Sequence, residues 1–244
     1  MKAWTGRTWT DDELAALPVR DGVRQRGLDA TRLDAFCDAA FAFAVTILVI
    51  STGGVPRSYA DLMRALRDVP AFAASFAAVA AFWGAHRQWG QRYGLDDRLS
   101  TLLSLGVVFV TLVYVYPLKM VFSALAAWAS RGALPANFTV ESVGELRGLF
   151  VVYGVGFAAQ SGLLALLYRH ALRAPGLALD AAERLHTRRH GASYLVMGAT
   201  GLVSAVWAAV MPGRLGVFAG FLYATLPVTM PLLARRGRAP ASPG

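Results

Sequence analysis

The segment from Arg32 to Ile50 constrains the fold of this chain more than any other. Three ionisable side chains, Arg32, Asp34 and Asp38, lead directly into an apolar run that continues to Thr52. Leu33 to Thr52 is about as long as the roughly 20 helical residues that cross ~30 Å of hydrocarbon. A carboxylate at the depth of Asp38 is costly unless it is paired or faces water, so we expect it to have a role.

The composition of the whole chain supports a membrane location. Of the 244 residues, 56% are hydrophobic and 16% are charged, whereas a soluble domain carries about 25% charged residues. Several separate apolar runs reach the length of a membrane span, which disfavours a soluble helical protein with a large core. We therefore predict an all-α, polytopic membrane protein embedded in a lipid bilayer.

Six transmembrane helices are predicted from the apolar runs and the turn residues between them. Residues 1–31 form an N-terminal arm, in which Thr10 is the expected N-cap of a short helix. Arg20, Arg24 and Arg26 in this arm are expected beside anionic lipid. A short amphipathic helix is expected over 59–68, on the side opposite the arm. The six spans are expected over 33–52, 69–89, 99–118, 149–167, 193–211 and 215–233.

The distribution of basic residues predicts the orientation. With six spans, the arm, two of the loops and the C-terminal tail, counted together with Arg32 and Arg87 at the adjoining span ends, carry 17 of the 24 Lys and Arg residues, and the remaining loops carry seven. Cytoplasmic segments are enriched in Lys and Arg, so both termini are predicted to be cytoplasmic. This asymmetry accounts for the net charge of +9 without a nucleic-acid partner. The single cysteine, Cys37, excludes an internal disulfide and is interpreted as a small packing residue.

A helical wheel divides the first span into two faces. At about 100° per residue, Asp34, Asp38 and Val45 lie on one face. The opposite face is apolar, with alanines and Thr46 at its margins, and carries Phe36, Phe43, Ile47 and Ile50. The wheel alone favours lipid contact or ordinary bundle packing for the apolar face.

Two short motifs resemble those of a known family. Arg32-x-x-x-Phe36-Cys37-Asp38 is similar to the Arg-x-x-x-Phe-Ser-Asp signature that opens the first transmembrane helix of the transmembrane protein 175 family. Ser75-Phe76, followed by Phe82-Trp83-x-x-His86-Arg87, resembles the Ser-Phe…Trp-x-x-His pattern of the second helix of the family. Cys37 replaces the usual serine, and Phe43 stands where the family usually has Ile or Leu at the pore constriction.

The resemblance implies a potassium channel of the bacterial, six-span type that assembles as a homotetramer. The first helix of each subunit would line a central pore, with apolar rings of Phe43, Ile47 and Ile50 at the constriction. Thr46 would offer its hydroxyl oxygen to a partly dehydrated cation, or would instead bond to a carbonyl of its own helix.

The resemblance also places Arg32, Asp38 and His86 in a polar network near the cytosolic mouth. This network either gates the pore through His86 or only braces the helices. Under this interpretation, residues 1–31 are the cytoplasmic arm, 32–234 the transmembrane channel domain and 235–244 a basic, disordered tail. The expected location is the bacterial plasma membrane.

Other patterns in the chain carry less information. Val152-Tyr153-Gly154 lies inside an unbroken apolar run without a pore loop, so we do not interpret it as a selectivity filter. His186 and His190 have the spacing of metal ligands, but the segment is rich in arginine and is expected to be a solvated loop. Gly216-x-x-x-Gly220 fits close helix packing.

No catalytic constellation is apparent, so we expect neither an enzyme nor a metal site, and no cofactor beyond transported potassium. The alternative function is a non-conducting membrane protein or a transporter of another solute, because four phenylalanine rings at a constriction can seal it.

Overall fold

The fold of the protein is described from a computed structural model, which describes residues 9–51, 55–136, 141–226 and 229. The described part of the chain begins with a short helix and a two-stranded hairpin, and the remainder of that part is almost entirely helical. The elements in order are α1 (Asp11–Ala15), β1 (Val19–Arg20), β2 (Val23–Arg24), α2 (Arg32–Ile50), α3 (Tyr59–Tyr93), α4 (Arg98–Ala129), α5 (Val143–Arg173), η1 (Pro175–Leu177), α6 (Ala181–Val210) and η2 (Gly213–Thr225).

Five of the helices, α2 to α6, are long and apolar enough to cross a membrane. The predicted all-α, multi-pass architecture is therefore confirmed. The sixth predicted span, over 215–233, lies partly outside the described residues. Within them, Gly213–Thr225 winds as the 3₁₀ helix η2. Gly220 lies so close to Phe150 of α5 that an added Cβ would stand 2.7 Å from the ring, which agrees with the predicted close packing of this segment.

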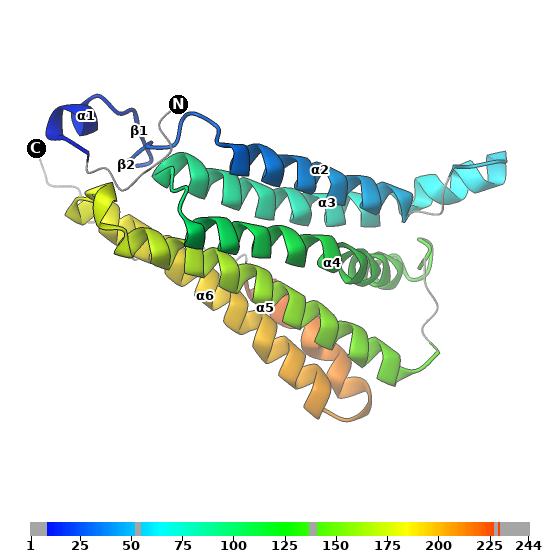
Figure 1. Ribbon diagram of the computed structural model, residues 1–244. Helices are drawn as coiled ribbons and strands as arrows, with labels where there is room; N and C mark the ends of the chain where they lie inside the picture. The colour runs from blue at the N-terminus through cyan, green and yellow to red at the C-terminus, as the bar shows by residue number, and fades with distance from the viewer. Residues whose placement is uncertain (1–8, 52–54, 137–140, 227–228, 230–244) are drawn as a thin grey trace, which may run out of the picture.

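The helices lie roughly along one direction and form an elongated bundle (Figure 1). α2 and α3 lie side by side along one edge, α4 lies in the middle, and α5 and α6 form the opposite edge. The β1–β2 hairpin lies at one end, beside the beginnings of α2, α4 and α6 and the ends of α3 and α5. We call this the hairpin end of the bundle.

Helix α3 is longer than predicted. The expected short helix over 59–68 and the span over 69–89 form one continuous helix of 35 residues. Pro70 lies inside this helix, where a proline removes one backbone hydrogen bond but does not always end the helix when neighbouring helices support it. The prediction of a separate helix was therefore wrong, because Pro70 does not interrupt α3 and the polar residues before it lie on the same continuous helix.

The predicted basic loop over 169–189 is also mostly helical. Helix α5 continues to Arg173 and α6 already begins at Ala181, so that η1 and a few flanking residues form the connection. Asp180 is the N-cap of α6 and forms a capping box with Glu183. His186 and His190 accordingly lie one turn apart on α6, with ring centroids 4.4 Å apart, and are half-buried. Their assignment to a solvated loop was wrong.

The most extensive contact between two helices is that of α5 with α6. Two glycines make it close: a Cβ added to Gly154 would stand 2.6 Å from the carbonyl oxygen of Gly201. Small residues at such a crossing let two membrane helices approach one another. Tyr153 packs edge-on against Tyr223 of η2 and parallel to Phe157 on its own helix, which extends this core.

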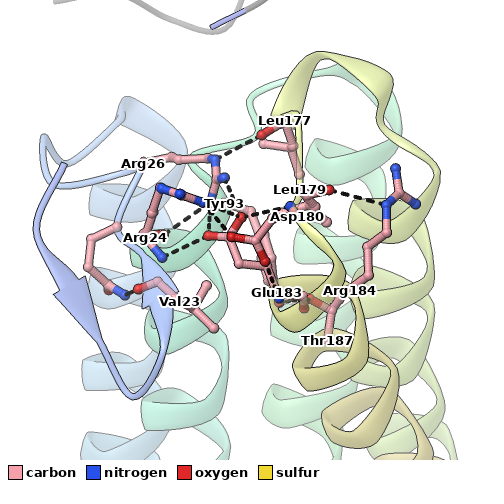
Figure 2. Close-up of polar contacts among 11 residues, drawn as sticks. Val23, Arg24, Arg26, Tyr93, Leu177, Leu179, Asp180, Glu183, Arg184 and Thr187 are labelled. Atoms are coloured by element: carbon pink, nitrogen blue, oxygen red, sulfur yellow. Dashed lines mark hydrogen bonds and ion pairs between the residues drawn. The ribbon is translucent and has the colours of Figure 1, made fainter. Parts of the chain in front are cut away.

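Ion pairs join the N-terminal arm to the start of α6. Thr10 is the N-cap of α1, as predicted, and forms a capping box with Glu13. Arg26, whose side chain is fully buried, donates two hydrogen bonds to the carboxylate of Glu183 on α6, at 2.8 and 2.9 Å (Figure 2). Arg24 pairs with Glu183 and Asp180. The expectation that Arg24 and Arg26 lie beside lipid was wrong, because their charges are already neutralised within the chain.

Candidate functional site

Helix α2, which carries most of the predicted site residues, begins with a capping box. The hydroxyl of Thr31 accepts a hydrogen bond from the backbone N–H of Asp34, and the Asp34 carboxylate accepts one from the backbone N–H of Thr31, both at 3.0 Å. These bonds satisfy two donors at the start of the helix. Asp34 therefore fixes the first turn of α2, and the pattern Thr-x-x-Asp was the signal for this in the sequence.

The two faces of α2 differ sharply in burial. The residues that pack on α3 and α4 are buried, namely Cys37, Phe41, Ala44 and Leu48. On the opposite side, Phe36, Phe43 and Ile50 are 54%, 58% and 67% exposed. Ile47 is half-buried and packs against the core, so it lies at the edge of the exposed stripe. We call Phe36, Phe43, Thr46 and Ile50 the exposed stripe of α2.

Thr46 is the only hydroxyl in the middle of α2, and it is exposed on this stripe. Its hydroxyl donates a hydrogen bond to the carbonyl oxygen of Ala42, one turn earlier, at 3.1 Å. The predicted bond to its own helix is therefore present. A hydroxyl that donates its proton keeps its oxygen lone pairs, so the Thr46 oxygen remains available to a cation beside the stripe.

Asp38 is bound to α3 through a tryptophan. The indole N–H of Trp83 donates a hydrogen bond to the Asp38 carboxylate at 2.7 Å. The contact is at the short end of the range for N–H···O hydrogen bonds. It joins α2 to α3 near the hairpin end of the bundle. Trp83 was part of the sequence motif, but its role as the partner of Asp38 was not predicted.

His86 lies near this contact but has a different partner. It is 2% exposed, and its Nε2 lies 2.9 Å from the hydroxyl of Ser104 on α4. Residues three apart on a helix point about 60° away from one another, so Trp83 faces α2 while His86 faces α4. The structure thus brings Asp38 and His86 to the same region without a direct hydrogen bond. The side chain of Arg32 is exposed and has no hydrogen bond or ion pair within the described part of the chain.

A buried ion pair lies away from the hairpin end, and sequence reasoning missed it. The ammonium of Lys119 on α4 lies 3.1 Å from the carboxylate of Asp68 on α3, and the two side chains are 6% and 1% exposed. Ionisable residues inside a membrane bundle usually pair with one another. No local signal in the sequence indicates this pair, because Asp68 and Lys119 lie 51 positions apart on different helices.

A further contact fixes the hairpin end. Asp97, the N-cap of α4, accepts backbone hydrogen bonds from Leu99 and Ser100 and lies 2.6 Å from Nε2 of His170 on α5. Burial alone would raise the pKa of Asp97, but the Ser100 N–H and the His170 ring outweigh it, so the pKa lies below its usual value. The carboxylate is therefore ionised at neutral pH.

The described residues contain no group of three or more His, Cys, Asp or Glu side chains that could hold a metal ion. The polar side chains instead join helices to one another, while α2 leaves an apolar stripe uncovered. These features define a multi-pass helical membrane protein whose edge helix is available to line or contact something outside the chain.

Comparison with known proteins identifies the family. Residues 32–117, which comprise α2, α3 and more than half of α4, match the family model described as the endosomal/lysosomal potassium channel TMEM175. A protein of Marivirga tractuosa named potassium channel is 33% identical over 213 residues, which are 81% of this chain and 83% of the relative.

Solved structures agree with this assignment. A crystal structure of a variant of the potassium channel MtTMEM175, in complex with a nanobody fusion, has a TM-score of 0.79 and 30% identity, covering 90% of this chain and 98% of the other. A lysosomal potassium-selective channel TMEM175 homologue from Chamaesiphon minutus shares the fold, with a TM-score of 0.53, 19% identity and coverage of 85% and 97%. The chain belongs to the TMEM175 family, which is a family of potassium channels and not of enzymes.

Proposed function

We propose that the protein is a potassium-selective channel whose pore is lined by the exposed stripe of α2. The observation that carries the proposal is the position of this stripe on an edge helix that opens the family-matched region. Phe36, Phe43 and Ile50 are spaced by seven residues, so they drift by only about 20° per step around a straight helix. They therefore form one nearly straight apolar line along α2.

A pore requires more than one copy of this helix. Each chain supplies one such edge helix. We propose that four chains, the number that the family resemblance implies, assemble with their α2 helices around a central pore. The rings of Phe43 and Ile50, with Ile47 at the edge, would then form an apolar constriction that gates by excluding water. The Thr46 oxygen would face a passing cation between these rings.

The polar contacts of α2 have a supporting role in this proposal. The Trp83–Asp38 hydrogen bond fixes the rotation of α2 about its axis, and the buried His86–Ser104 contact fixes α3 against α4. Arg32 remains exposed near the start of α2, where it would face the cytosolic mouth. Arg32, Asp38 and His86 would thus hold the pore helix in place.

The orientation and location form part of the proposal. We propose six spans with both termini in the cytoplasm, which places the hairpin end of the bundle on the cytoplasmic side. The basic residues support this orientation through the positive-inside rule. The bacterial relative supports the plasma membrane as the location.

The test is potassium flux from proteoliposomes. We expect the wild type to pass potassium faster than sodium, and Phe43→Ala and Thr46→Val to change the rate or the selectivity. Phe109→Ala is the matched control, because Phe109 is 68% exposed on α4 and lies outside the exposed stripe.

The alternative is a non-conducting protein or a transporter of another solute, and it is favoured by the bulk of Phe43. If neither the wild type nor Phe43→Ala passes any cation, the channel proposal fails. If Phe43→Ala alone conducts, the Phe43 ring is the block, and the wild type is a closed or non-conducting form.

A further inference from the structure

A polar pocket lies at the hairpin end, between the N-terminal hairpin and the last turns of α3. Its volume is about 200 Å³. Charged and amide side chains dominate its lining, and they include Arg20, Asp21, Arg87, Gln88, Gln91 and Arg92. The lining thus contains three guanidinium groups and one carboxylate. We call this cavity the arginine pocket.

The only carboxylate in the lining is already engaged. Asp21 lies 3.4 Å from Nη2 of Arg92, a side chain that is 3% exposed. The Nη1 of Arg92 has no hydrogen-bond partner among the described residues. A buried cation whose donors are only partly satisfied favours an additional acceptor. Arg92 therefore contributes positive charge to the pocket in spite of its contact with Asp21.

The other two arginines have free donors. The side chains of Arg20 and Arg87 form no hydrogen bond or ion pair within the described part of the chain, and both are exposed. The guanidinium of Arg87 lies over the ring of Trp83, with its central carbon 5.3 Å from the ring centroid. Such stacking restricts the side chain while leaving its N–H groups directed outward. The pocket thus has unused donors on both of its walls, one from the hairpin and one from α3.

This arrangement matches the chemistry of one ligand class. Arginine forks bind phosphate oxygens through paired N–H bonds, and several arginines around one anion are typical of phosphate recognition. We propose that the arginine pocket binds a phosphate group, carried either by the headgroup of an anionic phospholipid or by a soluble phosphate compound. The amides of Gln88 and Gln91 offer further donors to the same oxygens.

The pocket is also connected to α2. Trp83 lines the pocket, supports Arg87, and donates its N–H to Asp38. A phosphate held by Arg87 would therefore fix the tryptophan that positions α2. This connection rests on the proposed function, whereas the binding site itself does not.

The test measures the unfolding temperature of the purified full chain in an uncharged detergent. The two probes are inorganic phosphate and dioctanoyl phosphatidic acid, each compared with chloride at equal ionic strength. We expect at least one probe to raise the unfolding temperature in a saturable manner, because a ligand that binds only the native state stabilises it. Stabilisation by phosphatidic acid alone identifies the lipid headgroup as the source, and stabilisation by inorganic phosphate identifies a soluble one.

Variants decide whether the effect arises in the arginine pocket. In the double variant Arg20→Gln/Arg87→Gln we expect the apparent affinity to fall about tenfold or more, since two charge-assisted contacts are lost. Arg188→Gln is the matched control, because Arg188 is exposed near the start of α6 and lies outside the pocket. It should bind as the wild type does.

A second variant leaves the charge unchanged. Gly84 lines the pocket, and a Cβ added to it meets no atom within 4 Å. Gly84→Leu should therefore fold normally and reduce binding by occupying the pocket. The proposal is overturned if neither probe stabilises the wild type, or if the double variant and Gly84→Leu are stabilised as strongly as the wild type. Potassium flux with the same probes then tests the connection to α2 separately, so that failure of the channel proposal does not affect the binding result.

Discussion

Helices α2 and α5 are both apolar and both long enough to cross a membrane, but they are held in different ways. In the most apolar 18-residue segment of α5, 50% of the residues are buried inside the chain. The corresponding share for α2 is 22%. α5 is surrounded by α4, α6 and η2, and its contact with α6 is close enough to require glycine. The position of α5 is therefore determined within one chain, whereas α2 presents a face whose role depends on what lies outside it.

The largest expected loss of stability is at α6, the helix that packs on α5. Glu183→Ala removes the carboxylate that neutralises Arg26 and leaves a fully buried cation without its partner. We expect a loss of about 3–5 kcal/mol in the free energy of unfolding, measured by denaturation in detergent. Glu141→Ala, at an exposed position, is the control. Equal stability of the two variants would show that the arm does not depend on this ion pair.

The glycine contact between α5 and α6 should give the next largest effect. In Gly154→Ala the new methyl group would stand 2.6 Å from the Gly201 carbonyl oxygen, so the helices must separate. The expected cost is about 1–3 kcal/mol. Gly162→Ala on the same helix is the matched control, because a Cβ there meets nothing within 4 Å. If both variants unfold at the same temperature, the contact is looser than described.

The hydrogen bond that joins α2 to α3 should contribute less than the glycine contact between α5 and α6. Trp83→Phe keeps the ring but removes the N–H that binds Asp38. Because this contact is partly exposed to solvent, we expect it to cost only about 1 kcal/mol. Trp128→Phe, at a tryptophan that is 66% exposed on α4, provides the baseline. A loss of several kcal/mol would mean that this hydrogen bond contributes as much to the free energy of unfolding as the glycine contact between α5 and α6.

The smallest expected change in stability is at the exposed stripe itself. Phe43→Ala should alter the free energy of unfolding by no more than about 0.5 kcal/mol, as is usual for exposed positions. Phe41→Ala, two residues away, removes a side chain that is 3% exposed and should cost about 3–5 kcal/mol. Similar losses from the two variants would show that both faces of α2 are packed within one chain.

Local signals in the sequence predicted much of this fold. The start of α2, predicted at Leu33 and found at Arg32, and the N-cap at Thr10 follow from residue types within one or two turns. The helical wheel grouped Phe36, Phe43 and Ile50 on one face of α2, and the structure shows all three exposed together. These features depend only on residues that are close together in the sequence, so the sequence alone is enough to predict them.

Contacts between distant segments could not be predicted in the same way. Arg24 and Arg26 were assigned to the lipid surface because their partner, Glu183, follows more than 150 residues later. Asp68 was assigned to the end of a short helix because nothing near it in the sequence indicates Lys119 as its partner. Asp38 was expected beside His86, but the choice between His86 and Trp83 depends on the rotation of α3, which packing against α4 determines.

The Arg26–Glu183 pair also has a consequence for biosynthesis. The two residues are separated by 157 positions, so the ribosome needs roughly 8–30 s to reach the second after making the first, at ~5–20 residues per second. During that interval the N-terminal arm has no partner for its buried arginine, and it docks only after the start of α6 has been made. Docking of the arm therefore reports that α2 to α5 and the start of α6 have been synthesised, and a chain that stops before α6 leaves its first segment undocked.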